Sequence, residues 1–207
     1  MASTGRRRPR LKDLPGGQIT ELIVIVATAL IIALAVQWLL IKPYRIPSGS
    51  MEPTLDVGQR VLVSRFNYHL SDPDRGDIVV FHPPAGANSN TCGVQKPPDQ
   101  ACSRPVEEED SVNFIKRIVA IPGDTLSIQN GHAIVNGHRQ KDGFTDPCAP
   151  GTCNFPRPIK IPPDHFFMMG DNRGASDDSR FWGPVPEKWI IGQAFATYWP
   201  PRRWGIF

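Results

Sequence analysis

The chain has 207 residues, of which 40% are hydrophobic and 21% are charged, and its formal net charge is +3. This length allows one domain of about 165 residues beside an N-terminal segment, and it leaves no room for a second large domain. The excess positive charge lies in the first 17 residues, because the rest of the chain carries 18 basic and 19 acidic side chains. A near-neutral domain gives no sign of the basic surface that nucleic acids require, so we expect no nucleic acid partner.

An apolar run follows the basic tail. Residues 22–41 carry no charge and contain two polar residues, Thr28 and Gln37, and their number matches the roughly 20 residues that a helix needs to cross a bilayer. The alternative is a cleaved secretory signal with Ala33-Leu34-Ala35 as its site, although the apolar part of such a signal is normally only about 7–15 residues long. Because positive tails stay in the cytoplasm, we predict three segments. They are a cytoplasmic tail (1–19), a transmembrane helix (20–41) and an extracytoplasmic domain (42–207).

The pattern of this domain is typical of a mainly β, antiparallel fold. Short apolar or alternating runs lie between turn residues, and no amphipathic stretch is long enough for a major helix. Asn130-Gly131 separates two such runs at the spacing of a β-hairpin, and Asn136-Gly137 marks the next turn. The expected strands include residues 61–63, 78–81, 112–121, 125–128, 133–135, 166–169 and 190–199.

The four cysteines lie in two polar stretches, residues 83–111 and 141–158, that look like insertions into the β domain. An even number of cysteines outside the cytoplasm favours disulfides, and four cysteines permit three connectivities. Local pairing is the simplest of these. Neither local pair has the spacing of a structural zinc site, so we expect no metal. The local pairs are Cys92 with Cys102 and Cys148 with Cys153.

Ser50 and Lys116 are the residues that could carry chemistry. Ser50 follows the apolar run closely, and Lys116 stands in an otherwise apolar strand. A serine hydroxyl needs a neighbouring base, and a lysine can be that base if burial lowers its pKa. None of the five histidines lies in a motif that pairs it with a serine and an acid, although a triad assembled in space stays open. Alternatively, Lys116 is an edge-strand or snorkelling residue.

A third segment, residues 170–180, is dense in short polar side chains. Its Asp178 and Arg180 can form a charge-assisted pair. The segment could also be a solvated loop or a calcium loop, but the order of its acids does not fit the EF-hand pattern.

Four segments together resemble the type I signal peptidases, which are membrane-bound Ser-Lys peptidases. The resemblance runs from the apolar segment nearly to the C-terminus, and the segments stand in the order that the family shows. The cysteine-bearing stretches are not part of the family pattern. The segments are SGSMEPTL (48–55), RGDIVVF (75–81), FIKRIVAIPGD (114–124) and GDNRGASDDSR (170–180).

The resemblance implies a catalytic apparatus. Ser50 would be the nucleophile and Lys116 its general base, with the Ser48 hydroxyl and the Ser50 backbone N–H forming an oxyanion hole. Ser176 would orient the lysine amine, and Asp178 with Arg180 would hold the loop in place. The residues that match positions lining the substrate pockets are Ile46, Pro47, Met51, Leu55, Phe114 and Ile115.

The implied reaction is removal of signal peptides after small residues, at Ala-x-Ala type sites, through an acyl-enzyme. Neither a metal nor an organic cofactor is implied. The implied partners are signal-bearing preproteins and the lipid bilayer, with the enzyme working beside the export translocon.

Two other functions fit parts of the sequence. An autoprotease of the repressor type would also use a Ser-Lys catalytic pair. It would, however, carry an N-terminal DNA-binding helical unit where this chain has an apolar run. A non-enzymatic, anchored β domain that binds an exported partner would make Ser50 and Lys116 incidental.

Overall fold

The computed structural model describes residues 17–207, and the side chains of residues 18, 36–39 and 69 lie outside this description. Most of the predicted basic tail and the side chain of Gln37 are therefore outside the described residues. The described chain forms two compact units, with the boundary between Leu40 and Ile41. The first unit contains α1 (Gly17–Leu40).

The transmembrane helix predicted over 20–41 is not confirmed. No helix within the described residues is both long enough and apolar enough to cross a membrane. The helical segment ends one residue earlier than predicted, because Ile41 begins the first strand of the second unit.

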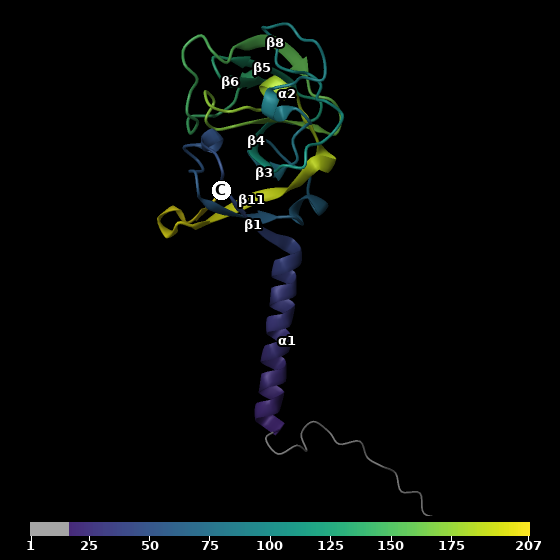
Figure 1. Cartoon of the computed structure of the whole chain (residues 1–207), viewed down its shortest axis with the longest axis vertical. Coiled ribbons are helices and arrows are strands. Elements are labelled where there is room, and N and C mark those ends of the chain that lie inside the picture. Colours follow the sequence, from purple (N-terminus) through teal and green to yellow (C-terminus); the bar gives the residue numbers. More distant parts are fainter. Residues whose placement is uncertain (1–16) are drawn as a thin grey trace, which may run out of the picture. The chain divides into compact units, whose positions relative to one another are not determined.

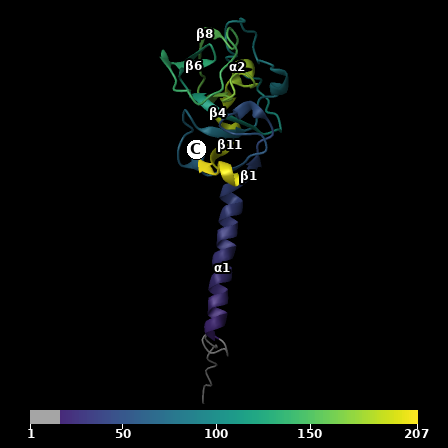
Figure 2. The same ribbon diagram turned by 90° about the vertical axis from the view of Figure 1, so that its left-hand side faces the viewer.

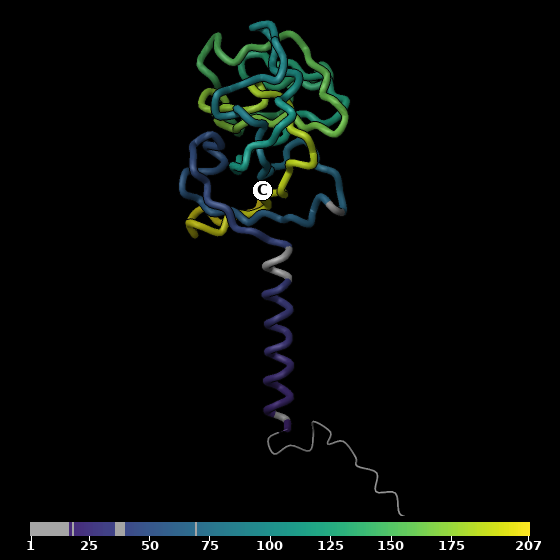
Figure 3. Tube along the Cα trace, turned by 45° about the vertical axis from the view of Figure 1, so that its right-hand side comes forward, coloured from purple at the N-terminus to yellow at the C-terminus, as the bar shows by residue number. Residues whose placement is uncertain are grey.

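The second unit confirms the mainly β, antiparallel fold. Its described residues form an eight-stranded sheet in the order β1-β2-β11-β3-β4-β9-β10, with β12 on β11, and a four-stranded sheet in the order β7-β6-β5-β8. Strands β5, β6 and β8 gather at one end of this unit, and β1 and β11 lie toward the other (Figures 1 and 2). The C-terminal segment runs beside the strands that begin the unit (Figure 3).

The strands have the following bounds: β1 (Ile41–Arg45), β2 (Arg60–Ser64), β3 (Ile78–Phe81), β4 (Phe114–Ala120), β5 (Thr125–Gln129), β6 (His132–Val135), β7 (His138–Arg139), β8 (Phe155–Lys160), β9 (His165–Met169), β10 (Val185–Pro186), β11 (Ile190–Trp199) and β12 (Gly205–Ile206). A short helix, α2 (Ser179–Trp182), follows β9.

Apolar side chains on both faces of β3 explain why this strand lies inside the large sheet. Ile78 and Val80 pack into one buried cluster, whereas Val79 and Phe81 pack into another. Successive side chains of a strand point to opposite faces, so a run of four apolar residues serves two cores. Burial of each such side chain contributes about 1.5–3 kcal/mol.

The predicted hairpin is present between β5 and β6. Its two turn residues, Asn130 and Gly131, have φ angles of 51° and 82°. Positive φ at both central positions is the geometry of a type I′ turn, which favours asparagine followed by glycine.

Five of the described strands were not predicted, and each pairs with only one other strand: β1, β7, β8, β10 and β12. β1 contains Pro43, and β8 contains Pro156 and Pro158. Proline lacks a backbone donor and is tolerated on an edge strand, where one side of the backbone needs no partner. β8 begins inside the stretch 141–158 and pairs with β5, so the last residues of that stretch belong to the sheet rather than to an insertion.

Candidate active site

Ser50 lies on a single-turn 3-10 helix, η2 (Gly49–Met51), that begins between β1 and β2. Met51 is fully buried and its carbonyl accepts the N–H of Leu55 at 2.9 Å. The carbonyl of Ser50 accepts the N–H of Asn172 at 3.1 Å. The turn is thereby fixed to the core on one side and to the loop after β9 on the other.

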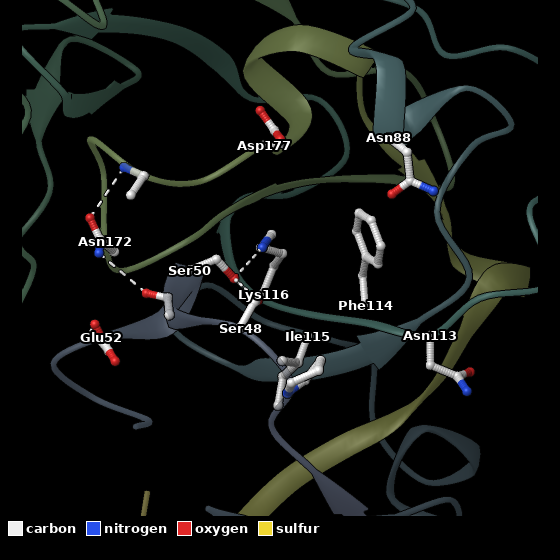
Figure 4. A pocket seen from close by; sticks show the side chains of 13 residues that line it. Ser48, Ser50, Glu52, Asn88, Asn113, Phe114, Ile115, Lys116, Asn172 and Asp177 are labelled. Atoms are coloured by element: carbon white, nitrogen blue, oxygen red, sulfur yellow. Dashed lines mark hydrogen bonds between the residues drawn. The ribbon is translucent and has the colours of Figure 1, made fainter. Parts of the chain in front are cut away.

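Lys116 comes from β4, which pairs with β3 and β9 in the middle of the large sheet. Its side chain is only 4% exposed, and its Nζ lies 2.6 Å from Ser50 Oγ (Figure 4). Burial lowers the pKa of Lys116 to about 8, although the nearby carboxylates of Asp178 and Asp177 oppose the change. The amine is therefore much closer to its neutral form at physiological pH than an exposed lysine is.

Ser48 lies beside the nucleophile position. Its hydroxyl donates toward Ser50 Oγ over 3.4 Å, and the residue is exposed. In this arrangement the Ser48 hydroxyl is close enough to reach an oxygen atom that approaches Ser50.

Asp178 and Arg180 form the predicted pair, and both side chains are fully buried. Arg180 donates from Nε to Asp178 Oδ1 at 2.7 Å and from Nη2 to Oδ2 at 2.8 Å. Burial alone would raise the pKa of Asp178, but the charge and hydrogen bonds of Arg180 and the N–H of Gly170 hold it below its ordinary value. Arg180 Nη2 also donates to the carbonyl of Ser176 at 3.1 Å, so the pair fixes the loop that lines the cleft beside Lys116.

Ser176 does not show the hydrogen bond expected from the resemblance. It is buried, and its Oγ has no hydrogen-bond partner among the described residues. A Cβ atom added to Gly170 would lie 2.2 Å from this Oγ and 2.4 Å from the carbonyl oxygen of Ser50. Only glycine therefore allows the loop to approach the serine turn this closely.

An ion pair between the partly buried Arg117 and the buried Asp171 was not predicted. Arg117 donates from Nε and Nη2 to the two carboxylate oxygens of Asp171, at 2.9 and 2.6 Å. Thr54 Oγ1 also donates to Asp171, at 2.6 Å. Because Arg117 follows Lys116 and Thr54 lies four residues after Ser50, Asp171 connects three segments of the site. The sequence held one sign of this: side chains alternate between the two faces of a strand, so Arg117 points to the face opposite Lys116.

An open cleft of about 530 Å³ contains both Ser50 and Lys116. Of the residues predicted to contact substrate, Pro47, Phe114 and Ile115 line it. The other three, Ile46, Met51 and Leu55, do not line it. They are at most 1% exposed and belong to the apolar core, so their contact with substrate stays a prediction. The remaining lining residues are Ser48, Gly49, Glu52, Asn88, Asn113, Asn172, Ala175 and Asp177.

Asn88 belongs to the stretch 83–111, so this stretch forms part of the cleft wall. No motif in the sequence indicated this, because a polar loop carries no periodic signal of what it covers. Asp177 lies in the polar segment noted above, and it accepts a hydrogen bond from Asn90 at 2.8 Å. The loop before β4 and the loop after β9 are thereby joined.

The structure contains the two local disulfides, Cys92–Cys102 and Cys148–Cys153. Each disulfide has one cysteine that contacts Arg180. The N–H of Cys102 donates to the Arg180 carbonyl at 3.0 Å, and Arg180 Nη1 lies 3.7 Å from Cys148 Sγ. Within residues 17–207, no group of three or more histidine, cysteine, aspartate or glutamate side chains is arranged to hold a metal ion.

The site thus combines a hydroxyl, a buried amine of lowered pKa and a cleft open to solvent. No histidine lines this cleft among the described residues. Such a set can activate the hydroxyl as a nucleophile without a Ser-His-Asp arrangement.

Comparison with known proteins identifies the family. A family model described as signal peptidase, peptidase S26, matches residues 19–199. The probable signal peptidase I-1 of Synechocystis sp. is 36% identical over 187 residues, covering 90% of this chain and 86% of its relative. Signal peptidase I of Leptolyngbya laminosa is 34% identical over 189 residues, covering 90% and 83%. Thylakoidal processing peptidase 1 of Arabidopsis thaliana is 35% identical and covers 85% and 47%.

Among solved structures, a signal peptidase I from Enterococcus faecalis matches 59% of this chain and 97% of its own, with 21% identity and a TM-score of 0.39. The matches in sequence confirm the resemblance found in the four segments. The chain therefore belongs to the signal peptidase family, peptidase S26, and is a serine endopeptidase.

Proposed function

We propose that this chain is a membrane-anchored endopeptidase that removes signal peptides from exported preproteins, with Ser50 as nucleophile and Lys116 as general base. The observation that carries the proposal is the 2.6 Å distance between Lys116 Nζ and Ser50 Oγ inside an open cleft. The names of the relatives, signal peptidase I and thylakoidal processing peptidase, support the substrate class.

In the first half-reaction, neutral Lys116 takes the proton from Ser50 Oγ as this oxygen attacks the scissile carbonyl carbon. The carbonyl oxygen becomes an oxyanion and is stabilised by the Ser50 N–H and the Ser48 hydroxyl. The C–N bond then breaks, and the leaving amine takes the proton that Lys116 holds. The result is an acyl-enzyme on Ser50 and a free mature N-terminus.

In the second half-reaction, Lys116 takes a proton from water, and the resulting hydroxide attacks the ester carbon. The bond to Ser50 Oγ breaks, and this oxygen recovers the proton from Lys116. Asp178 and Arg180 do not touch the reacting atoms in this scheme. They hold the loop whose Ala175 and Asp177 line the cleft beside Lys116, and burial is what keeps the pKa of this lysine low.

The apolar part of the cleft supports a preference for small residues before the cut. Pro47, Phe114 and Ile115 form this part, and the buried Ile46, Met51 and Leu55 support it from the core. The small apolar side chains of an Ala-x-Ala site would pack against this apolar surface, and no charged group would have to be desolvated there.

The direct test is cleavage of a preprotein with an Ala-x-Ala site by the full chain and by its Ser50→Ala variant. We expect the wild type to release the signal peptide after the second alanine and the variant to release none. Cleavage by the Ser50→Ala variant at the wild-type rate would overturn the assignment.

The anchor is a separate part of the proposal. Several large apolar side chains of α1 are more than half exposed, including Leu22 at 61% and Ile31 at 66%, and such surface is costly in water. We propose that this helix holds the enzyme in the membrane with residues 42–207 outside, beside the translocon that delivers preproteins. Carbonate extraction of membranes should leave the full chain in the pellet, and release to the supernatant would contradict the anchor.

The two alternative functions are disfavoured on different grounds. An autoprotease of the repressor type would carry a DNA-binding helical unit before the catalytic domain, and the apolar composition of residues 22–41 is unsuited to one. A purely binding domain would make the buried lysine an unexplained cost, because desolvating an amine destabilises the fold.

A further inference from the structure

Charged side chains are scarce in the cleft. Of its 13 lining residues, only Glu52, Lys116 and Asp177 are ionisable. The two carboxylates differ in their surroundings, because Asp177 accepts a hydrogen bond from Asn90 at 2.8 Å. The carboxylate of Glu52 makes no ion pair or hydrogen bond with any residue in the described part of the chain.

The position of Glu52 is set by the serine turn. Its N–H donates to the carbonyl of Gly49 at 3.1 Å. A Cβ atom added to Gly49 would lie 3.0 Å from Glu52 Oε2, so the carboxylate folds back over the backbone next to Ser50. The residue is half-buried, and its charge is therefore less screened than that of a fully exposed side chain.

The cleft has two chemically different sides (Figure 4). Phe114, Asn113 and Asn88 lie on one side of Ser50, whereas Glu52 lies on the other, next to Asn172. If the small apolar residues before the cut occupy the side of Phe114 and Ile115, the chain that follows the cut must leave over the side of Glu52. The leaving-group side of the cleft is then the negatively charged side.

We infer that Glu52 determines specificity on the leaving-group side, favouring basic residues and disfavouring acidic residues in the first two positions of the mature chain. This inference rests on the proposed function, since it assumes that Ser50 attacks the peptide in this cleft. The physical cause is attraction between the unpaired carboxylate and a passing lysine or arginine, and repulsion of aspartate or glutamate.

The test uses three peptides that share one Ala-x-Ala site and differ only in the two residues after the cut, which are Lys-Lys, Ala-Ala or Asp-Asp. The measured quantity is the ratio of kcat/KM for the Lys-Lys and Asp-Asp peptides, which does not depend on the fraction of active enzyme. For the wild type we expect a ratio of roughly five or more, as a half-buried charge pair allows. Glu52→Gln should bring the ratio close to one, and Glu52→Lys should invert it.

The matched control is Glu107→Gln, which removes the same charge from an exposed residue that does not line the cleft. This variant should keep the wild-type ratio. A wild-type measurement adds a test that needs no variant, because added salt should lower the ratio toward one.

An unchanged ratio in Glu52→Gln, or a wild-type ratio near one at low salt, would overturn the inference while the proposed function stands. Failure of the wild type to cleave any of the three peptides would overturn both. If Glu52→Gln proves unfolded, the salt dependence of the wild-type ratio decides the question.

Discussion

Lys116 Nζ lies 2.6 Å from Ser50 Oγ, although 66 residues separate the two in sequence. The contact forms because β4 lies in the middle of the large sheet, and the turn that carries Ser50 packs against it. The strand buries the amine, and burial is the largest cause of its lowered pKa. The position of Lys116 in the sheet therefore determines how readily its amine can accept a proton.

The first prediction concerns the pH dependence of cleavage. Because the neutral amine is the active form, kcat/KM should rise with pH through an apparent pKa of about 8 and then level off. Asp177→Asn removes a carboxylate that raises the pKa of Lys116, so its profile should shift to lower pH. Glu107→Gln removes a distant charge and should leave the midpoint in place. Equal midpoints in all three proteins would contradict this electrostatic account.

The second prediction concerns the stability cost of the buried lysine. Its folded pKa of about 8 lies below the ordinary 10.5, so the unfolded chain binds more protons between these values and stability rises with pH there. The cost is fully present below pH 8 and amounts to about 3 kcal/mol. Lys116→Met should therefore be inactive, yet up to this much more stable in urea at pH 7. A Lys116→Met protein that is clearly less stable than wild type would contradict the prediction.

The third prediction uses two glycines of one loop. Gly170→Ala places a methyl group 2.4 Å from a backbone oxygen of Ser50, so the loop must move and cleavage should fall by at least about tenfold. Gly174→Ala is the matched control, since its nearest neighbours are at 3.5 Å, an ordinary contact distance. Assays of the two variants should differ sharply. Similar activities would show that the close approach of the loop is unimportant.

The fourth prediction separates the two disulfides. Asn88, which lines the cleft, lies four residues before Cys92, whereas no residue of 141–158 lines the cleft. The Cys92→Ser/Cys102→Ser variant should lose about 3 kcal/mol of stability and show a raised KM for peptides. Cys148→Ser/Cys153→Ser should lose stability with little change in KM. A raised KM in the second variant alone would mean that the wall contributed by Asn88 does not matter for binding.

The strands were predictable where hydrophobic pattern and turn chemistry agreed. Ile78 to Phe81 form an apolar run between turns, and Asn130-Gly131 supplies the two positive φ angles of the hairpin. β1 and β8 escaped prediction because they contain proline and polar residues, which only a position at a sheet edge allows. Edge positions follow from the order of strands, and no single segment encodes that order.

The site was predictable to a similar extent. Ser50, Lys116 and the pair of Asp178 and Arg180 stand in recognisable motifs, and the structure places them close together. Asn88 and Asn113 come from a polar loop whose path depends on tertiary contacts, so no pattern in the sequence indicated them. Ile46 and Leu55 matched pocket positions but are core residues here, because apolar side chains suit both places.

Replacement of Lys116 by arginine tests the central claim most directly. Arginine keeps the positive charge and much of the stem, but its guanidinium stays protonated at working pH and has no lone pair to accept a proton. Cleavage of a preprotein with an Ala-x-Ala site should be measured for wild type and Lys116→Arg in parallel, with circular dichroism to verify the fold. We expect no detectable cleavage by the folded variant. Retention of a substantial fraction of wild-type cleavage would contradict Lys116 as the general base.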